Sequence, residues 1–235
     1  MSQTFTIIIP VYNEAAFFES AFKQLVDDMS ETGIGWDLIV VENGSTDDTA
    51  NIVSSILEAW NGEGTMLQLP DPDYGAALRA GLLRSSADWT VTFDIDYFSA
   101  PFVETVATTG ADIVIASKRA EGSDDRRPAI RRFGTWGLSQ VLRFLLSSQV
   151  QDTHGIKAFS RSVVDDVAGQ VTRTKDLFDT ELIIRAERLG YTIVETPIVV
   201  EERRAAGSPF LKRIPRTLWG LTQLRRALPP KTTSR

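Results

Sequence analysis

The stretch "TFTIIIPVYNEAAFFESAFKQLVDDM", residues 4–29, decides the fold class. Its first part, Thr4–Ile9, is apolar and rich in β-branched residues without polar alternation, which is typical of a parallel strand buried on both faces. We expect Pro10 to close this strand and Asn13 to cap a following helix. The inward face of that helix is predicted at Phe17, Phe18, Ala21, Phe22, Leu25 and Met29. The stretch therefore predicts one strand followed by one helix.

The same alternation continues along the chain. Further strands are predicted in "WDLIVVEN", "TMLQLP", "WTVTF" and "ADIVIAS", with helices after "GSTDDT" and in "YGAALRAGLLRSSA". This order predicts an α/β fold with a mostly parallel, Rossmann-like sheet flanked by helices. Beyond Arg119 the pattern is less regular. Helices are expected over 130–148 and 178–189, a strand in "YTIVETPIVV", and a helical pattern over 209–228 that Pro215 and Gly220 interrupt.

Composition restricts the chemistry. The 235 residues contain no cysteine, which excludes disulfides, thiolate metal sites and a cysteine nucleophile. No run of about 18 apolar residues suggests a membrane span, so we expect a cytoplasmic protein. The net charge of −6 is uneven, because the segment from Glu201 onward carries nine Lys or Arg against two acids. We expect no nucleic-acid partner, but this basic end could contact the anionic cytoplasmic face of a membrane.

Polar residues follow the predicted strands, where ligands bind in parallel sheets. They are Tyr12, Asn13 and Glu14; Glu42, Asn43, Gly44 and Ser45; Asp71 and Asp73; and Asp94 and Asp96. Asn13 and Ser45 could equally be helix caps, and the two last aspartates could be a turn device. Two carboxylates so close repel each other, however, and we favour a site for Mg²⁺ or Mn²⁺. The sequence lacks both the "GxxxxGK[ST]" and the "GxGxxG" motif, so this cation is expected to serve a leaving nucleoside diphosphate.

Seven motifs in order carry a resemblance: "IIIPVYNEA", "LIVVENGSTDDTA", "YGAALRAGL", "VTFDIDYFSAP", "IASKR", "QDTHGIKAFSR" and "FDTELIIRAERLGYTIVETPI". Together they resemble the family 2 glycosyltransferases of GT-A fold, in the branch of dolichyl- or polyprenyl-phosphate mannosyl- and glucosyltransferases. The resemblance implies a GT-A domain over 1–208 and leaves 209–235 as a basic amphipathic segment. It implies a nucleotide-sugar donor of the GDP-mannose or UDP-glucose type.

The resemblance also implies roles for individual positions. Asp94 and Asp96 match the family's Asp-x-Asp motif, with Asp96 as the more direct metal ligand and His154 as either a further metal contact or an ordinary turn residue. Asp152 lies in the acceptor motif, which is shortened here to "DTHGIKAF". The donor-binding positions are Pro10, Tyr12, Asn13, Glu14, Glu42, Asn43, Gly75, Asp94 and Arg119, of which Glu42 and Asn43 replace two aspartates that are usual in the family. The acceptor phosphate is assigned to Arg119, Arg203 and Arg204, each of which could instead be a solvated surface charge.

The implied reaction is displacement of the nucleoside diphosphate with inversion, in which Asp94 and Asp152 are the expected catalytic residues. A lipid-phosphate acceptor needs no strong base, whereas a soluble hydroxyl acceptor would use Asp152 as its base. The helix over 130–148 and the basic segment favour a lipid acceptor with peripheral membrane contact, although both could instead cover the sheet or form a homodimer face. A nucleotidyltransferase is disfavoured because "PVYNEAAF" is not a glycine-rich basic loop, and a non-catalytic nucleotide-sugar-binding homologue remains an alternative.

Overall fold

The computed structural model describes residues 3–117, 120–125, 129–150, 152–153, 155–174, 177–200 and 210–228. Seven strands form one sheet in the order β3-β2-β1-β4-β7-β5-β8. They are β1 (Phe5–Val11), β2 (Trp36–Asn43), β3 (Gly64–Leu69), β4 (Trp89–Thr92), β5 (Ile113–Ser117), β7 (Lys157–Ser160) and β8 (Ile193–Pro197). Strand β7 runs antiparallel to β4 and β5, while the other pairings are parallel. A separate parallel pair joins β6 (Asp124–Asp125) to β9 (Val199–Val200). The predicted α/β class is confirmed.

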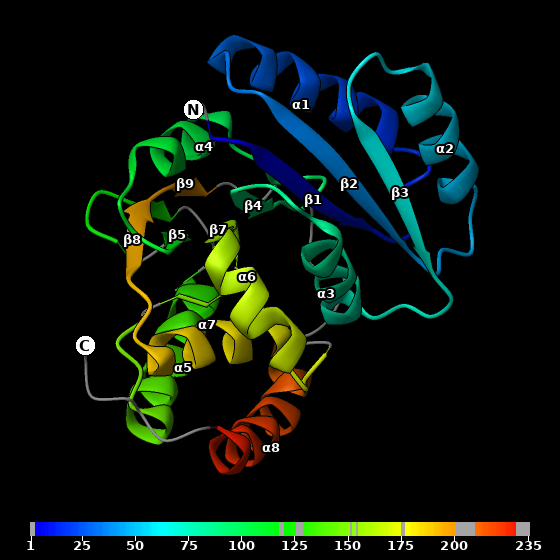
Figure 1. The fold of residues 1–235 in the computed structure, drawn as a ribbon. Helices are drawn as coiled ribbons and strands as arrows, with labels where there is room; N and C mark the ends of the chain where they lie inside the picture. Colours follow the sequence, from blue (N-terminus) through cyan, green and yellow to red (C-terminus); the bar gives the residue numbers. More distant parts are fainter. Residues whose placement is uncertain are drawn as a thin grey trace.

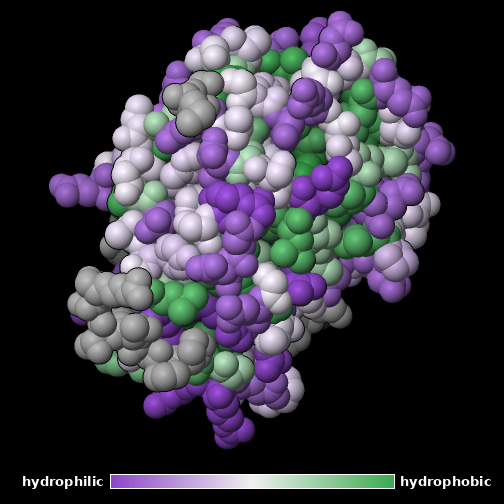
Figure 2. Space-filling model, viewed as in Figure 1, coloured by the Kyte–Doolittle hydropathy of each residue, from purple (hydrophilic) through white to green (hydrophobic). Residues whose placement is uncertain are grey.

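Helices cover both faces of the sheet (Figure 1). One face packs against α1 (Phe18–Thr32), α2 (Thr49–Ala59) and α4 (Ala100–Thr108). The other packs against α3 (Tyr74–Arg84), α6 (Arg161–Val167) with the short η1 (Ala168–Gln170), and α7 (Phe178–Leu189). Strand β1 supplies both cores, because Ile7 and Ile9 belong to the first cluster and Ile8 to the second. This double burial explains why the strand is apolar throughout. Figure 2 shows the outer face in this view covered mainly by hydrophilic side chains, with an apolar area over α3.

A third apolar cluster lies away from the sheet. It joins α5 (Ala129–Leu146) to α8 (Phe210–Ala227), at the lower end of the molecule in Figure 1. Its buried members are Leu142, Leu146, Leu177, Ile184, Leu221, Leu224 and Leu228. The helix α8 runs without a break through Pro215 and Gly220, and our expectation that these residues interrupt it was wrong. Gly220 lies against Leu177, where a β-carbon would come within 2.3 Å of the leucine Cδ1. The boundary predicted at 208/209 falls at residues outside those described.

Strand β1 continues two residues past its predicted end, because Pro10 lies inside it, opposite Val41. The carbonyl of Ile8 accepts a hydrogen bond from Phe93 of the chain that follows β4. The backbone nitrogen of residue 10 faces the same neighbouring strand, β4, as the carbonyl of residue 8. The pairing with β4 ends at Ile8. The missing N–H of proline therefore costs no sheet hydrogen bond at this position.

Within the described residues, no helix has the length and apolar character required to cross a membrane.

Gly81 marks a close approach of α3 to β1. An added β-carbon would lie 2.6 Å from Cγ2 of Ile8, a fully buried residue. We expect Gly81→Ala to lower the free energy of unfolding by about 1–3 kcal/mol through overpacking. Gly137 on α5 has open space at the same position. Gly137→Ala should instead raise stability by about 0.5–1 kcal/mol, the helix-propensity gain. Urea denaturation measures both, and equal effects would contradict this packing argument.

Asp88 fastens the entry of β1. Its Oδ2 accepts hydrogen bonds from the backbone N–H and the hydroxyl of Thr4, each at 2.9 Å. These bonds hold the pKa of Asp88 below its ordinary value of 3.8. A depressed pKa contributes stability above the unfolded-state value, and this contribution is lost as the pH falls through the folded-state value. We therefore expect Asp88→Ala to lower the melting temperature at pH 6 and to have progressively less effect below about pH 4. A constant difference between pH 6 and pH 3 would contradict this.

Candidate functional site

The carboxyl ends of β1, β2 and β4 meet at one edge of the sheet. Val11 is in register with Glu42, and Ile8 with Thr92, so the loops after these strands begin close together. The chain leaves β1 toward β2 on one side and returns as β4 on the other. Such a change of direction opens the crevice in which α/β proteins bind ligands. The structure thus brings the residues predicted after β1, β2 and β4 to a single edge.

The loop after β1 is tied to the loop after β2 by side-chain hydrogen bonds. Asn13 has a positive φ of 54°, its N–H donates to Ser45 Oγ at 3.0 Å, and its Oδ1 accepts from the Thr46 N–H at 2.8 Å. The N–H of Glu14 donates to Thr49 Oγ1 at 2.8 Å. Helix α1 begins only at Phe18 and α2 at Thr49. Asn13 and Ser45 are therefore loop-joining residues, and the helix-cap interpretation was wrong for both.

Glu42 and Asn43 are buried at the end of β2. Glu42 Oε1 accepts from the Ser45 N–H at 2.6 Å and closes its own turn. Asn43 Oδ1 accepts from the Asp73 N–H at 2.9 Å, and Asp73 Oδ1 in turn caps α3 by accepting from Ala76. These two residues shape the rim of the edge. Gly75 is buried in the first turn of the same helix.

Asp94 and Asp96 occupy one tight turn after β4. The N–H of Tyr97 donates to the Asp94 carbonyl at 2.9 Å, and the Asp94 N–H donates to the Tyr97 carbonyl at 3.3 Å. Between the two aspartates, Ile95 is buried in the core and anchors the turn. The turn interpretation and the ligand interpretation are thus compatible, because the anchored turn presents two half-buried carboxylates at the edge.

Tyr74, the first residue of α3, fixes the orientation of Asp94. Its hydroxyl donates to Asp94 Oδ1 at 3.0 Å. Burial raises the pKa of Asp94, while the Tyr74 hydrogen bond and the Lys157 charge oppose that rise. Burial of the hydroxyl, together with the Asp94 charge, also raises the pKa of Tyr74 well above its ordinary value. Tyr74 therefore stays a neutral hydrogen-bond donor to the carboxylate at neutral pH.

The reversed strand β7 delivers the acceptor motif to the same edge. Lys157, its first residue, lies opposite Thr92, the last residue of β4. The segment preceding β7 therefore reaches the edge where β4 ends. In that segment Asp152 is buried, and its N–H donates to Glu195 Oε1 at 3.1 Å. Strand β7 was not predicted from the sequence, so the position of Asp152 near this edge could not be derived from the order of strands.

Three residues of this edge were missed from the sequence: Tyr74, Lys157 and Asp179. Lys157 is completely buried; its Nζ donates to the Gly155 carbonyl at 2.5 Å and lies 3.1 Å from Asp179 Oδ2. All three lie inside motifs quoted above. A lysine between apolar residues in "GIKAF" was the available signal, because a buried lysine requires a partner.

The described residues fit a divalent cation through two carboxylates, those of Asp94 and Asp96. No group of three or more metal-binding side chains occurs within the part of the chain that the structure describes. Mg²⁺ and Mn²⁺ sites that serve phosphates commonly use one or two carboxylates and take their other ligands from phosphate and water. His154, Arg119, Arg203 and Arg204 lie outside the described residues. Their predicted roles stay predictions.

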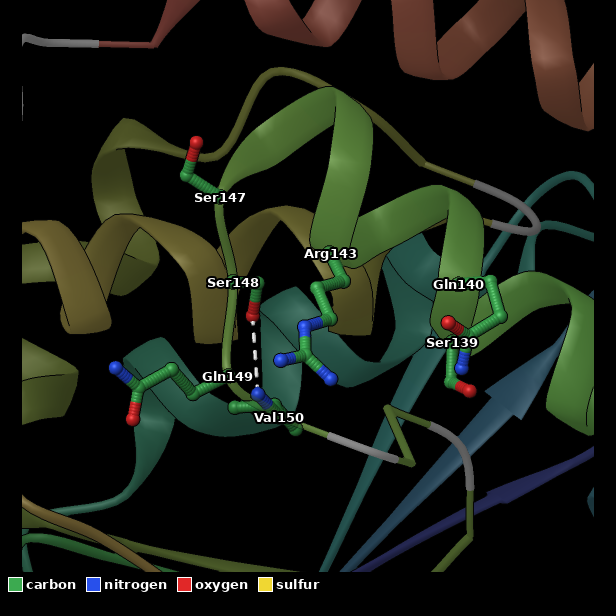
Figure 3. A pocket seen from close by; sticks show the side chains of 7 residues that line it. All are labelled: Ser139, Gln140, Arg143, Ser147, Ser148, Gln149 and Val150. Carbon is green, nitrogen blue, oxygen red and sulfur yellow. Dashed lines mark hydrogen bonds between the residues drawn. The ribbon is translucent and has the colours of Figure 1, made fainter.

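Neither of these carboxylates lines the polar cavity of about 660 Å³ that Figure 3 shows. It lies between the C-terminal half of α5 and the segment that follows it, and Arg143 points into it. Its lining consists of Ser139, Gln140, Arg143, Ser147, Ser148, Gln149 and Val150. None of the predicted site residues is among them. Val150 precedes Asp152 by two residues, so the cavity adjoins the acceptor motif along the chain.

The family model described as Glycosyl transferase family 2 matches residues 6–168. A dolichyl-phosphate hexose transferase of Haloferax volcanii is 28% identical over 203 residues, which cover 84% of this chain and 82% of that protein. Glycosyltransferase AglD of the same organism is 25% identical over 240 residues. That alignment covers 92% of this chain but only 37% of AglD. The dolichyl-phosphate beta-glucosyltransferase ALG5A of Trichomonas vaginalis is 23% identical over 212 residues, 82% of this chain and 64% of that protein.

Solved structures share the fold. Glucosyl-3-phosphoglycerate synthase from Mycobacterium tuberculosis, in complex with uridine diphosphate, matches with a TM-score of 0.66 and 23% identity. The alignment covers 97% of this chain and 81% of that one. The same protein in complex with Mn²⁺, UDP-glucose and phosphoglyceric acid gives the same TM-score and coverage. The likeness confirms the predicted GT-A fold class.

Proposed function

This chain belongs to glycosyl transferase family 2, and on that basis we propose that it transfers a hexose from a nucleotide-diphosphate sugar to the phosphate of a polyprenyl or dolichyl lipid. The observation that carries the proposal is the anchored turn of Asp94 and Asp96 at the carboxyl edge of the sheet. Family membership supports the transfer of a sugar as the reaction. Donor, acceptor and residue roles are part of the proposal.

The residues at the edge divide the work. Asp94 and Asp96 would hold Mg²⁺ or Mn²⁺, which offsets the negative charge of a leaving diphosphate. Tyr74 keeps Asp94 oriented through its hydroxyl. The joined loops of Asn13 and Ser45 form the wall on the other side of the crevice, where the base and ribose of the donor would lie. A lipid phosphate is already anionic at neutral pH, so it must be held close to the sugar rather than deprotonated.

Three observations support a lipid-phosphate acceptor. Two of the relatives named above are dolichyl-phosphate transferases. Arg143 lines a polar cavity that adjoins the acceptor motif, and an arginine fork suits phosphate oxygens. Phe144 on α5 and Trp219 on α8 are 82% and 62% exposed, and α8 ends with Arg225 and Arg226. Exposed aromatic and basic residues of this kind favour peripheral contact with an anionic membrane, although the same surface would also serve a homodimer.

Calorimetry and thermal shift test the donor. Wild-type protein is titrated with UDP, GDP and dTDP, alone and as sugar conjugates, with and without Mn²⁺. We expect one nucleotide to bind tightly and only with metal. A folded protein that binds none of them would contradict the transferase proposal and favour a non-catalytic homologue.

Transfer of labelled sugar tests the acceptor. Short-chain polyprenyl phosphate, polyprenol and 3-phosphoglycerate are compared with the donor that the titrations identify. We expect transfer to polyprenyl phosphate alone. Transfer to the soluble hydroxyl compound instead would replace the lipid acceptor and give Asp152 the role of general base.

A further inference from the structure

The ion pair of Lys157 and Asp179 lies beside the end of β4, because Lys157 is in register with Thr92. Lys157 is wholly buried and Asp179 is 8% exposed. Removing a charged pair from water is costly, and two apolar residues at the same positions would avoid that cost. Asp179 Oδ2 contacts the lysine, and its buried Oδ1 has no hydrogen-bond partner among the described residues. Among the described residues this carboxylate therefore contacts Lys157, and the contact indicates the role of Asp179.

Lys157 has two carboxylates within electrostatic reach. Its charge acts attractively on Asp94, while Asp179 repels Asp94. An ammonium group has three donors, of which the Gly155 carbonyl and Asp179 take two. Strand pairing places the lysine opposite Thr92, two residues before Asp94. A lysine released from Asp179 would be free to turn toward Asp94, which lies two residues beyond the strand partner of Lys157, Thr92.

We propose that Asp179 holds the Lys157 ammonium away from Asp94 and thereby keeps this carboxylate available to the divalent cation. Asp179 and Lys157 are positioning residues in this scheme, since neither contacts the cation. The inference rests on the proposed function in one respect, which is that Asp94 is a ligand of the cation that serves the leaving diphosphate.

The test uses opposite effects of two substitutions. Mn²⁺ is titrated into the protein with GDP, UDP and dTDP in separate experiments, and free Mn²⁺ is followed by electron paramagnetic resonance. Asp179→Asn should weaken Mn²⁺ binding by about 10–100-fold, the usual effect of removing an outer-shell partner. Lys157→Met should bind Mn²⁺ at least as tightly as the wild type, because the competing cation is gone. Both substitutions leave one buried charge unpaired, so both should lower the melting temperature measured without metal.

The direction of the change in Mn²⁺ affinity distinguishes a positioning role from a role in stabilising the fold. Equal weakening of Mn²⁺ binding by both substitutions would overturn the proposal, and so would unchanged binding by folded Asp179→Asn. The double variant Lys157→Met/Asp179→Asn leaves no unpaired charge at these two positions and guards against misfolding of the single variants. It should bind Mn²⁺ as the wild type does, and a 10-fold or greater loss in the double variant would overturn the proposal.

Glu181→Gln provides a matched control on the same helix. Glu181 is a buried carboxylate paired with Arg185. The substitution should lower the melting temperature but leave the Mn²⁺ affinity unchanged. Failure of the proposed function gives a different result from failure of this inference. In the first case wild-type protein binds Mn²⁺ with none of the three nucleotides, which removes both proposals. In the second case the wild type binds Mn²⁺, and only the pattern among the variants differs from the expected one.

Discussion

We expect Asp96→Ala to abolish metal-dependent nucleotide binding and to lower the rate of sugar transfer by about a thousandfold, because it removes one of the two charges proposed to hold the cation. Stabilising the charge on a departing diphosphate is worth several kcal/mol, and each 1.36 kcal/mol is about tenfold in rate. Asp94 already accepts a hydrogen bond from Tyr74 at Oδ1, whereas no hydrogen bond is recorded for the Asp96 side chain within the described residues. Asp96 is therefore the freer carboxylate of the two.

The melting temperature of the metal-free protein distinguishes the loss of a metal ligand from damage to the turn. The turn is held by backbone hydrogen bonds and by Ile95, none of which Asp96→Ala removes. Loss of one of two neighbouring like charges should leave the melting temperature of the metal-free protein unchanged or raise it. Asp165→Ala is the matched control, because this exposed carboxylate pairs with Arg161 on α6. Calorimetry with Mn²⁺ and a transfer assay measure the two effects, and full activity of Asp96→Ala would remove the metal site from the mechanism.

Arg185→Met is expected to lower the free energy of unfolding by about 3–5 kcal/mol, the cost of leaving a buried charge without its partner. The charge left behind belongs to Glu181, which is fully buried. Its oxygens accept from Arg185 at 2.7 Å, from the backbone of Arg173 at 2.8 Å and from Thr172 at 3.2 Å. The pair thus fastens the segment before α7 to the helix itself. Without the guanidinium, the Glu181 carboxylate keeps only its hydrogen bonds to Thr172 and to the backbone of Arg173.

Urea denaturation measures this loss, with Asp165→Ala again as control. Asp165 and Arg161 are also four residues apart on a helix, but they are exposed, and breaking an exposed pair costs at most about 1 kcal/mol. The double variant Glu181→Leu/Arg185→Met should recover much of the stability, since it leaves no charge unpaired. A single variant Arg185→Met as stable as the wild type would show that Glu181 is satisfied without its arginine.

The sequence predicted the first half of the fold well because β1 and β4 are buried along their whole length and β2 along most of its length. Continuous apolar runs such as Thr4–Ile9 and the stripe of α1 leave few alternatives, and the helix over 178–189 was confirmed to the residue. Strand β7 was missed because its four residues, "KAFS", show no period that distinguishes a short strand from a loop. Its antiparallel direction depends on tertiary pairing with β4 and β5, which no local pattern encodes.

The site could be predicted in position but not in its supporting contacts. Strand ends alone placed Asp94 and Asp96 at the edge, because parallel strands converge there. The roles of Asn13 and Ser45 depend on bonds to a loop about 30 residues away, and those of Tyr74, Lys157 and Asp179 on three separate elements. Local preference for helix caps misled the interpretation of Asn13, since its side-chain oxygen joins the loop after β1 to the loop after β2 instead.

The third apolar cluster has a consequence for the order in which the molecule opens. Helices α5 and α8 bury leucines against each other and reach the rest of the protein through Leu177 and Ile184, whereas the two larger clusters enclose the sheet. Proteins open in cooperative units whose free energies differ with the apolar contact that each unit makes. Amide hydrogen exchange should therefore find α5 and α8 exchanging together through a partial unfolding that leaves β1 and β2 protected. The two helices would then detach and reform as one layer while the catalytic edge stays folded.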